Sequence, residues 1–305
     1  MAWLELSLTL HASQQTRVEG ALEDLGALSI TLRDADADTP DERAIFEPGV
    51  GEIPLWNEIV LQALFDAAAD RAGLVAALTD LAPELSPERI AFREVEDQDW
   101  TRAWMDTYQP MRFGRRLWIY PTTTEPNGID ADAVVVRLDP GLAFGTGTHP
   151  TTALCLEWLD AIADAGALAG KQLIDFGCGS GVLAVAALKL GAAHALGVDN
   201  DAQAIVASRV NAERNSVGEQ LDVYLPEDFP TQQADILVAN ILAGPLADLA
   251  ALFAAHVTPG GLLALSGILA GQQTELLEVY AQWFDELAVA QREDWIRISG
   301  VRRRA

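Results

Sequence analysis

Three glycines spaced two residues apart constrain the fold of this chain more than any other feature. Gly177, Gly179 and Gly181 lie in LIDFGCGSGVLAVAALKLG, residues 173–191, between a short apolar run and a longer one. Glycine adopts positive φ readily and lets a ligand approach the backbone where a Cβ would collide. Such a bare turn between a buried strand and a helix is typical of nucleotide-binding α/β proteins. The segment therefore predicts a ligand site at the carboxyl end of a parallel strand.

The residues around this turn alternate between the periodicities of strands and helices. We expect strands at residues 171–176, 195–199, 221–225, 234–239 and 262–266, and a final pair at 287–292 and 295–301. Helices are expected at residues 151–165, 181–190, 202–215, 245–256 and 272–284. Parallel strands need crossover helices, so this order predicts a mainly parallel sheet with helices on both faces. Residues 133–305 are thus expected to form one α/β domain.

The first 97 residues follow a different order. Strands are expected at residues 2–10, 28–33, 57–66 and 89–96, and helices at 13–25 and 71–81. The order βαβ followed by βαβ predicts a small α+β domain of the ferredoxin-like type. This segment contains no glycine-rich nucleotide loop, nucleophile elbow or metal-ligand spacing. Residues 1–97 are therefore expected to recognise a partner rather than to carry chemistry.

Residues 98–132 are expected to form a connector and a hairpin arm, because residues 121–128 are rich in Pro, Thr, Asn and Gly. Aromatic side chains are frequent in this segment and could form a recognition surface. Burial at a domain junction is the favoured interpretation, because buried aromatic groups dominate the energetics of such contacts. The aromatic residues concerned are Trp100, Trp104, Tyr108 and Trp118.

The chain is strongly acidic. Its 20 basic and 45 acidic side chains give a formal net charge of −25, and residues 1–100 hold 21 of the acidic and 6 of the basic ones. Such a surface repels phosphate backbones, which argues against nucleic acid as the direct partner. It permits a basic protein as a partner, although a merely soluble acidic protein is the alternative.

Nothing in the sequence indicates a membrane span or a metal site. No apolar run reaches the ~20 residues that cross a bilayer, and Glu5 interrupts the apolar N-terminus, so the chain is expected in the cytoplasm. Cys155 and Cys178 lack the CxxC spacing of a zinc site and are expected to be reduced thiols. The histidines also show no metal-ligand spacing; they are His11, His149, His194 and His256.

The glycine spacing and a second acidic residue narrow the class of ligand. Dinucleotide sites usually show GxGxxG, which places a pyrophosphate at a helix N-terminus. Here the spacing is GxGxG with Asp175 two residues before it, which favours a nucleoside with a charged amino-acid tail. Asp199 ends the next strand 22 residues after Gly177, where a carboxylate can accept hydrogen bonds from both ribose hydroxyls. Capping of the following helix is the alternative, open also to Asn200 and Asp201.

Two other segments place polar groups near the expected ligand. Asn240 ends the strand of ADILVANILAGPL, where its amide offers both a donor and an acceptor to a reacting centre, or else forms a turn. In DPGLAFGTGTHPTT, residues 139–152, a helix start with Thr151 and Thr152 is a natural seat for a carboxylate.

Two residues have side chains that could act in catalysis, but their positions in the sequence favour structural roles. His149 titrates near neutral pH, but a histidine at a helix start is more often structural than a proton carrier. Cys178 has no base beside it in the sequence, so it is interpreted as a small residue of the glycine loop rather than a nucleophile.

Together these motifs resemble a known family. DxGxGxG at residues 175–181, followed by Asp199 and a seven-strand pattern ending in a hairpin, is similar to the Rossmann-like S-adenosyl-L-methionine-dependent methyltransferases. More narrowly, LDPGLAFGTGTHPTT, IDFGCGSG, VANILAGPL and the acidic N-terminal segment resemble the bacterial methyltransferases of ribosomal protein L11 of the large subunit. The resemblance extends over residues 1–303.

The resemblance implies a fold, a reaction and a set of site residues. The fold would be a Rossmann-like seven-stranded domain preceded by a small ferredoxin-like one. The reaction would be repeated transfer of methyl groups from S-adenosyl-L-methionine to lysine ε-amines and the N-terminal α-amine of the basic protein L11. The implied cofactor-binding residues are Thr152, Gly177, Gly179, Asp199 and Asn240.

One motif departs from the pattern of many amino-methyltransferases. Asn240 is followed by Ile-Leu-Ala instead of Pro-Pro and an aromatic residue, which argues against a glutamine or adenine target. A lysine target must arrive neutral although its ordinary pKa is about 10.4, so desolvation or a nearby acceptor has to favour loss of its proton. The sequence identifies no general base.

Two other functional classes remain open to the sequence, which also leaves the oligomeric state open. One is an oxidoreductase that uses a nicotinamide dinucleotide, which the glycine spacing disfavours. The other is a ribosome-assembly or scaffold protein that uses the sheet for binding alone.

Overall fold

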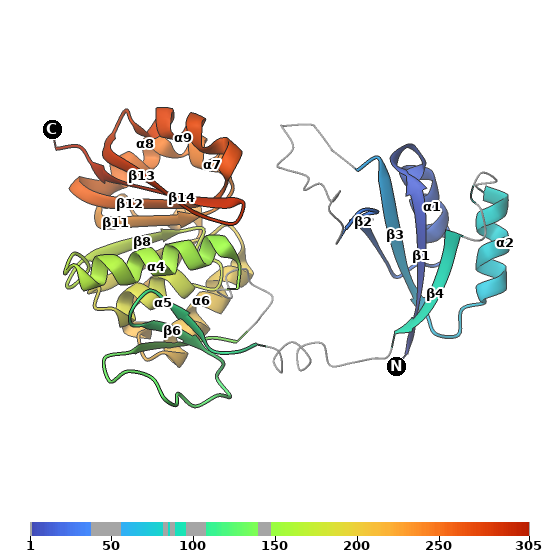
Figure 1. Ribbon diagram of the computed structural model, residues 1–305, viewed down its shortest axis with the longest axis horizontal. Helices are drawn as coiled ribbons and strands as arrows, with labels where there is room; N and C mark the ends of the chain where they lie inside the picture. The colour runs from blue at the N-terminus through green and yellow to red at the C-terminus, as the bar shows by residue number, and fades with distance from the viewer. Residues whose placement is uncertain are drawn as a thin grey trace. The chain divides into compact units, whose positions relative to one another are not determined.

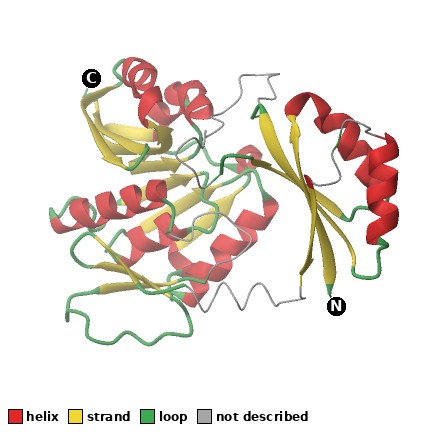
Figure 2. Cartoon of the chain, turned by 45° about the vertical axis from the view of Figure 1, so that its right-hand side comes forward, coloured by secondary structure: helices red, strands yellow, loops and turns green. Residues whose placement is uncertain are grey.

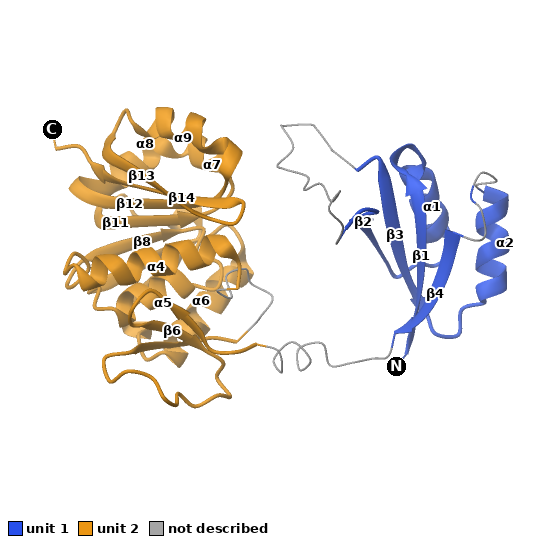
Figure 3. Cartoon of the chain, viewed as in Figure 1, with its two compact units in different colours: residues 1–99 blue, residues 100–305 orange. Residues whose placement is uncertain are grey.

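The computed structural model describes residues 2–37, 56–81, 85, 89–95, 108–139 and 148–304 of the chain. The chain divides into two compact units, residues 1–99 and residues 100–305 (Figure 3). Of the helices that are described, none is both long and apolar enough to cross a membrane.

Unit 1 is an antiparallel sheet with two helices. The strand order is β2-β3-β1-β4, and α1 and α2 lie on one face of the sheet (Figure 2). The elements are β1 (Trp3–His11), α1 (Gln15–Asp24), β2 (Ser29–Asp34), β3 (Glu58–Asp66), α2 (Arg71–Leu81) and β4 (Ile90–Val95). This is the ferredoxin-like arrangement that the sequence predicts.

The core of unit 1 follows from the period of two in its strands. Leu4, Leu6, Leu8 and Leu10 of β1 are all at most 1% exposed, while the residues between them are less deeply buried. Alternate side chains of a strand point to opposite faces, so these leucines share the face that the helices cover. Leu22 of α1 belongs to the same buried cluster.

Unit 2 is built around a seven-stranded sheet in the described part of the chain, with strand order β10-β9-β8-β11-β12-β14-β13 (Figure 1). Strands β10, β9, β8, β11 and β12 are parallel, and β14 is antiparallel to both of its neighbours. The strands are β8 (Gln172–Phe176), β9 (His194–Val198), β10 (Leu221–Tyr224), β11 (Ala234–Asn240), β12 (Val257–Leu269), β13 (Phe284–Arg292) and β14 (Trp295–Arg302). The prediction of a Rossmann-like α/β fold is confirmed.

Helices cover both faces of this sheet. Ile236 and Val238 of β11 pack in the same cluster as α4 and α5, whereas Leu237 and Ala239 pack with α7, α8 and α9. A central strand buried on both faces is the pattern expected of a parallel sheet. The helices are α4 (Pro150–Asp164), α5 (Val182–Lys189), α6 (Ala202–Arg214), α7 (Ala243–Asp248), α8 (Ala250–His256) and α9 (Gln273–Tyr280).

Several elements differ from the sequence-based prediction. Helix α9 ends at Tyr280 instead of residue 284, and β13 begins at Phe284 instead of residue 287. The single helix expected at 245–256 is two segments, α7 and α8, which meet at Leu249 with φ −86° and ψ −1°. Strand β12 begins at Val257, five residues before the predicted start at 262. Val257 already pairs with Ala234 of β11, and the register then shifts before Leu262, so the Pro-Gly-Gly run is absorbed as a bulge inside the strand.

A small sheet of three strands, β5 (Met111–Phe113), β6 (Leu117–Tyr120) and β7 (Val134–Arg137), packs on the α4 and α5 side of unit 2. The β5–β6 hairpin lies where the sequence predicts a hairpin arm, whereas β7 was not expected as a strand. Tyr108 is 6% exposed and belongs to the core of unit 2, and Trp118 is half-buried. Trp100 and Trp104 lie outside the described residues.

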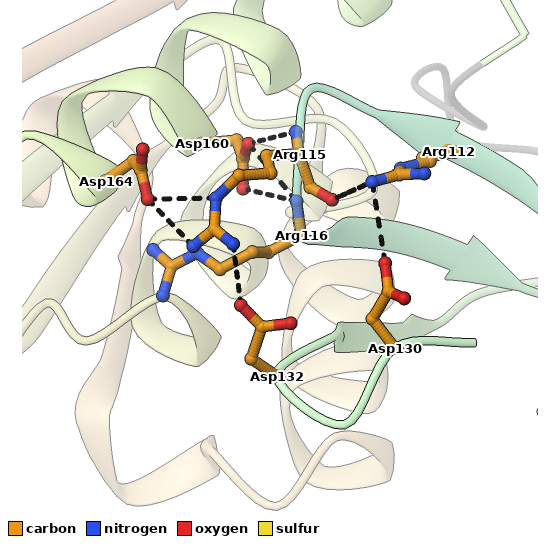
Figure 4. Close-up of polar contacts among 7 residues, drawn as sticks. All are labelled: Arg112, Arg115, Arg116, Asp130, Asp132, Asp160 and Asp164. Atoms are coloured by element: carbon orange, nitrogen blue, oxygen red, sulfur yellow. Dashed lines mark hydrogen bonds and ion pairs between the residues drawn. The ribbon is translucent and has the colours of Figure 1, made fainter.

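A polar cluster fastens the β5–β6 turn to α4 (Figure 4). The Asp160 carboxylate, only 2% exposed, accepts the backbone N–H of Arg115 at 2.5 Å and that of Arg116 at 3.2 Å. Gly114 precedes them with φ +65°, and a Cβ there would lie 2.4 Å from the Asp160 carboxylate. On the solvent side, the Arg115 guanidinium contacts Asp164 at 2.8 Å. This cluster holds the hairpin against the helix whose first turn enters the candidate site.

Candidate functional site

The carboxyl ends of β8, β9 and β11 open onto two adjoining cavities. The larger has a volume of about 660 Å³ and the smaller about 220 Å³, and both are lined by Gly177, Asp199 and Asn240. This is the edge of a parallel sheet at which ligands bind in open α/β folds. All five residues predicted from the sequence line the smaller cavity, namely Thr152, Gly177, Gly179, Asp199 and Asn240.

The glycine loop needs its glycines. Gly177, Gly179 and Gly181 have φ values of +77°, +54° and +73°, a region that residues with a Cβ rarely adopt. The N–H of Gly177 donates to the Val198 carbonyl at 2.7 Å, which holds the loop against the end of β9. A Cβ at Gly177 would lie 2.2 Å from Cγ2 of Ile241, so this position leaves no room for a side chain.

Asp199 connects the glycine loop to the start of α6. Its Oδ2 accepts the N–H of Gly179 at 2.8 Å, and its Oδ1 accepts the N–H of Asp201 at 3.0 Å. The cap of α6 is Asp201, whose carboxylate accepts the N–H of Gln203 at 2.8 Å. The alternative role of a helix cap therefore belongs to Asp201, and the Asp199 side chain stands on the wall of both cavities.

Asp175, at the end of β8, is a buried acid behind the loop. It is 0% exposed; its Oδ2 accepts the N–H of Ala184 at 3.1 Å, while its Oδ1 has no hydrogen-bond partner among the described residues. Burial raises the pKa of this carboxyl to about 7, the charge of Asp199 adds to the rise, and the Ala184 bond opposes it. Asp175 therefore titrates near neutrality, unlike an exposed carboxyl.

Asn240 and Thr152 meet where the two cavities join. The Asn240 amide nitrogen Nδ2 donates to Oγ1 of Thr152 at 3.2 Å. The amide oxygen Oδ1 of Asn240 is buried and has no hydrogen-bond partner in the described parts of the chain. A buried acceptor without a partner costs free energy, so this oxygen suits a ligand that brings an N–H group.

His149 caps α4 and faces an aromatic ring. Its Nδ1 accepts the N–H of Thr151 at 3.3 Å and lies 2.7 Å from the Thr151 hydroxyl. Because Nδ1 accepts a backbone N–H, the neutral ring carries its proton on Nε2. Burial lowers the pKa of His149, against a smaller opposing effect of the Glu293 charge. His149 therefore caps α4, and its ring also lines the larger cavity.

The thiol of Cys178 fits its interpretation as a loop residue. It is 6% exposed, and its Sγ lies 3.4 Å from Oγ of Ser208. Burial raises the pKa of Cys178 to about 12, so the reactive thiolate is strongly disfavoured. The loop residues 140–147, which the sequence places beside the carboxylate seat, lie outside the described residues.

Much of the larger cavity is apolar and was not foreseen. The wall residues missed by the sequence interpretation are Phe176, Val198, Pro226, Ile241, Leu242, Pro245, Leu249, Gly267 and Trp295. Phe176 and Gly267 had a usable signal, since each stands at the carboxyl end of a strand of the parallel sheet. Trp295 had none, because it reaches the cavity from β14 by tertiary folding, where its ring packs edge-on to His149 at 4.8 Å.

Comparisons with known proteins find similarity along nearly the whole chain. A family model described as Ribosomal protein L11 methyltransferase (PrmA) matches residues 2–303. A protein named ribosomal protein L11 methyltransferase from Stenotrophomonas maltophilia (strain K279a) is 59% identical over 305 residues, covering 99% of this chain and 100% of that protein. One of the same name from Xanthomonas axonopodis pv. citri (strain 306) is 56% identical with the same coverage.

A solved structure gives the corresponding similarity in three dimensions. The crystal structure of a ribosomal protein L11 methylase from Lactobacillus delbrueckii subsp. bulgaricus matches with a TM-score of 0.56 and 30% sequence identity. The match covers 65% of this chain and 100% of that one.

Proposed function

The chain belongs to the ribosomal protein L11 methyltransferase family, and from this premise we propose that it transfers methyl groups from S-adenosyl-L-methionine to lysine ε-amines and the N-terminal α-amine of protein L11. The observation that carries the proposal is the convergence of Thr152, Gly177, Gly179, Asp199 and Asn240 on one cavity at the carboxyl edge of the sheet.

The chemistry of this cavity fits an adenosine joined to an amino acid. The positive φ of Gly177 and Gly179 shapes the loop so that both glycines line the smaller cavity. The Asp199 carboxylate offers acceptor oxygens suited to the two ribose hydroxyls. At the start of α4, the Thr152 hydroxyl lines the smaller cavity and suits the carboxylate of the methionyl tail.

The residues of the chain would then align the amine and exclude water. Bound S-adenosyl-L-methionine supplies a methyl group already activated by its sulfonium, so no protein nucleophile is required. Asn240 Oδ1, which has no partner among the described residues, would accept an N–H of the incoming amine and orient its lone pair. The apolar wall that includes Leu242 and Trp295 disfavours the charged ammonium, which lowers the pKa of the lysine.

We further propose a division of labour along the chain. Residues 1–97 would recognise the substrate, residues 98–132 would connect, and residues 133–305 would bind the cofactor and transfer the methyl group. The acidic excess of the first hundred residues favours contact with a basic protein rather than with nucleic acid. We expect the reaction to occur in the cytoplasm.

The test is methylation of purified L11 by the purified chain with S-adenosyl-L-methionine, followed by intact-mass measurement and peptide mapping. We expect mass increments of whole methyl groups on lysines and the N-terminus. L11 from a strain that lacks the chain should also be lighter than L11 from its parent. Unmodified L11 in both experiments would contradict the proposal, and a melting temperature raised by NAD but not by S-adenosyl-L-methionine would favour the oxidoreductase instead.

A further inference from the structure

An exposed apolar stripe begins at the mouth of the reaction cavity and continues along α7 and α8. Although Leu249 separates the two helices, helical hydrogen bonds continue through it: its N–H donates to the Pro245 carbonyl at 3.0 Å, and its carbonyl accepts the Phe253 N–H at 2.9 Å. Residues three or four apart therefore share one side of this segment. We call the side formed by Leu242, Pro245, Leu249 and Leu252 the ledge.

Two residues of the ledge are well exposed, although positions next to them on the same helices are fully buried. Leu242 and Leu252 are 54% and 41% exposed. Leu246 and Phe253, in contrast, are both 0% exposed and pack in the core beneath. Leu246 and Phe253 attach α7 and α8 to the sheet, and Leu249 of the ledge is partly buried against the same core. Leu242 and Leu252 are the apolar side chains of the ledge that stay open to a partner.

The ledge also stands out by its lack of charge. Residues 240–255, NILAGPLADLAALFAA, include a single charged side chain, Asp248, in a chain with a formal net charge of −25. Exposed apolar groups that gather in one place on a soluble protein mark interaction sites. Recognition on this surface would therefore depend on apolar contact and not on the acidic charge that dominates the rest of the chain.

The ledge is continuous with the site of the proposed reaction. Leu242, Pro245 and Leu249 line the larger cavity together with Asn240, and Leu252 extends the same line one further turn away. A lysine that enters this cavity is followed by its own backbone, which has to cross the mouth. The substrate residues next to that lysine are thus the groups that meet the ledge.

We propose that the ledge binds an apolar side chain of the substrate protein that lies close to the amine being methylated. This inference rests on the proposed function and adds a selection rule to it. The acidic residues of unit 1 would attract any basic protein, whereas the ledge would favour those amines that have an apolar neighbour.

The experiment compares the full chain carrying Leu252→Ser with the unaltered chain. Leu252 does not line the cavity, so the affinity for S-adenosyl-L-methionine in calorimetry and kcat at saturating L11 should stay within twofold. The KM for L11 should rise about fivefold, because the serine loses the apolar area buried in the complex. Val206→Ser is the matched control, since Val206 is a 61% exposed aliphatic residue on α6, and its KM should not change.

A KM for L11 that Leu252→Ser leaves unchanged would contradict binding of the substrate at the ledge while leaving the proposed function intact. If the melting temperature also fell, the ledge would be covered by this chain itself. Failure of the unaltered chain to methylate L11 is a different result, which would contradict the proposed function and with it the occupant of the ledge.

Discussion

At the scale of single residues, the Asp199 carboxylate has a structural role in the loop and a proposed role in cofactor binding. It bonds the backbone N–H groups of Gly179 and Asp201, and we propose that it also accepts hydrogen bonds from a ribose. Asp199→Ala should therefore weaken binding of S-adenosyl-L-methionine by at least about tenfold, since hydrogen bonds to a charged acceptor are worth about 1.5–3 kcal/mol. Isothermal calorimetry measures this change.

Asp201→Ala is the matched control for that experiment. It removes the cap of α6, which should cost about 1 kcal/mol of unfolding free energy, but it should leave the cofactor affinity unchanged. Equal affinities for the unaltered chain and Asp199→Ala would rule out the ribose assignment.

The buried carboxyl of Asp175 predicts a specific dependence of stability on pH. Its pKa is raised to about 7 in the folded chain, against about 3.9 for an unperturbed aspartate. The folded chain thus keeps a proton that the unfolded chain releases from about pH 4 upward, so this stabilising contribution is complete below pH 4 and is lost as pH rises through 7.

Asp175→Asn removes this titration while keeping the shape of the side chain. The unfolding free energy of Asp175→Asn minus that of the unaltered chain should rise by up to about 1.4 kcal/mol per pH unit between pH 4 and 7. Above pH 7 this difference should stay constant. Urea denaturation at a series of pH values measures the difference. Parallel curves for the two proteins would show that Asp175 is already ionised in the folded state.

The residues of the site that were predictable from sequence are those fixed by local patterns. The glycine loop and Asp199 follow strand ends within one stretch of chain, so spacing alone identified them. Ile241 was missed although it neighbours Asn240, because its role is visible only from its position against Gly177, which follows the neighbouring strand β8. Trp295 comes from a distant antiparallel strand, and no spacing rule connects it to the loop.

At the scale of elements, the Asp160 cluster predicts how strongly the hairpin is held to α4. Asp160→Ala would leave the N–H groups of Arg115 and Arg116 without their partner beside a buried site, which should cost roughly 1–3 kcal/mol of unfolding free energy. Urea denaturation of the full chain measures this loss.

Asp164→Ala, one turn further along α4, is the control for the cluster. It removes only an ion pair with the exposed Arg115 side chain, and such pairs contribute little to stability. If both substitutions destabilised the chain equally, the buried backbone contacts would not be what holds the hairpin.

Element boundaries were predictable where the periodicity agrees with the glycine and proline signals. The predictions were wrong where strand pairing extends an element past those signals. Helix 71–81 has the predicted bounds. Strand β12 does not, because Pro259 and the two glycines after it are usually loop residues, yet pairing of Val257 with β11 starts the strand before them. The division at Leu249 had no glycine or proline at that position to signal it.

At the scale of the whole molecule, the acidic excess is greatest in the first hundred residues, whereas the candidate cofactor site lies in the later part of the chain. Unit 1 has its own core, in which Leu6, Leu61 and Leu78 are fully buried, and unit 2 has two more clusters on either side of its sheet. The described residues that line the cavities we assign to the cofactor belong to unit 2. Cofactor binding and substrate recognition should therefore be separable by truncation.

Removal of residues 1–97 should leave the affinity for S-adenosyl-L-methionine within about twofold, because the lining residues that the structure describes are all kept, and should abolish methylation of L11. Calorimetry and radiolabelled methyl incorporation measure the two quantities on the same preparation. In the full chain the KM for L11 should rise with added salt, because exposed charges that attract a basic protein are screened beyond about 10 Å at 0.1 M. A truncated chain that methylates L11 as efficiently as the full one would assign recognition to unit 2, and the ledge would then be the first surface of that unit to test.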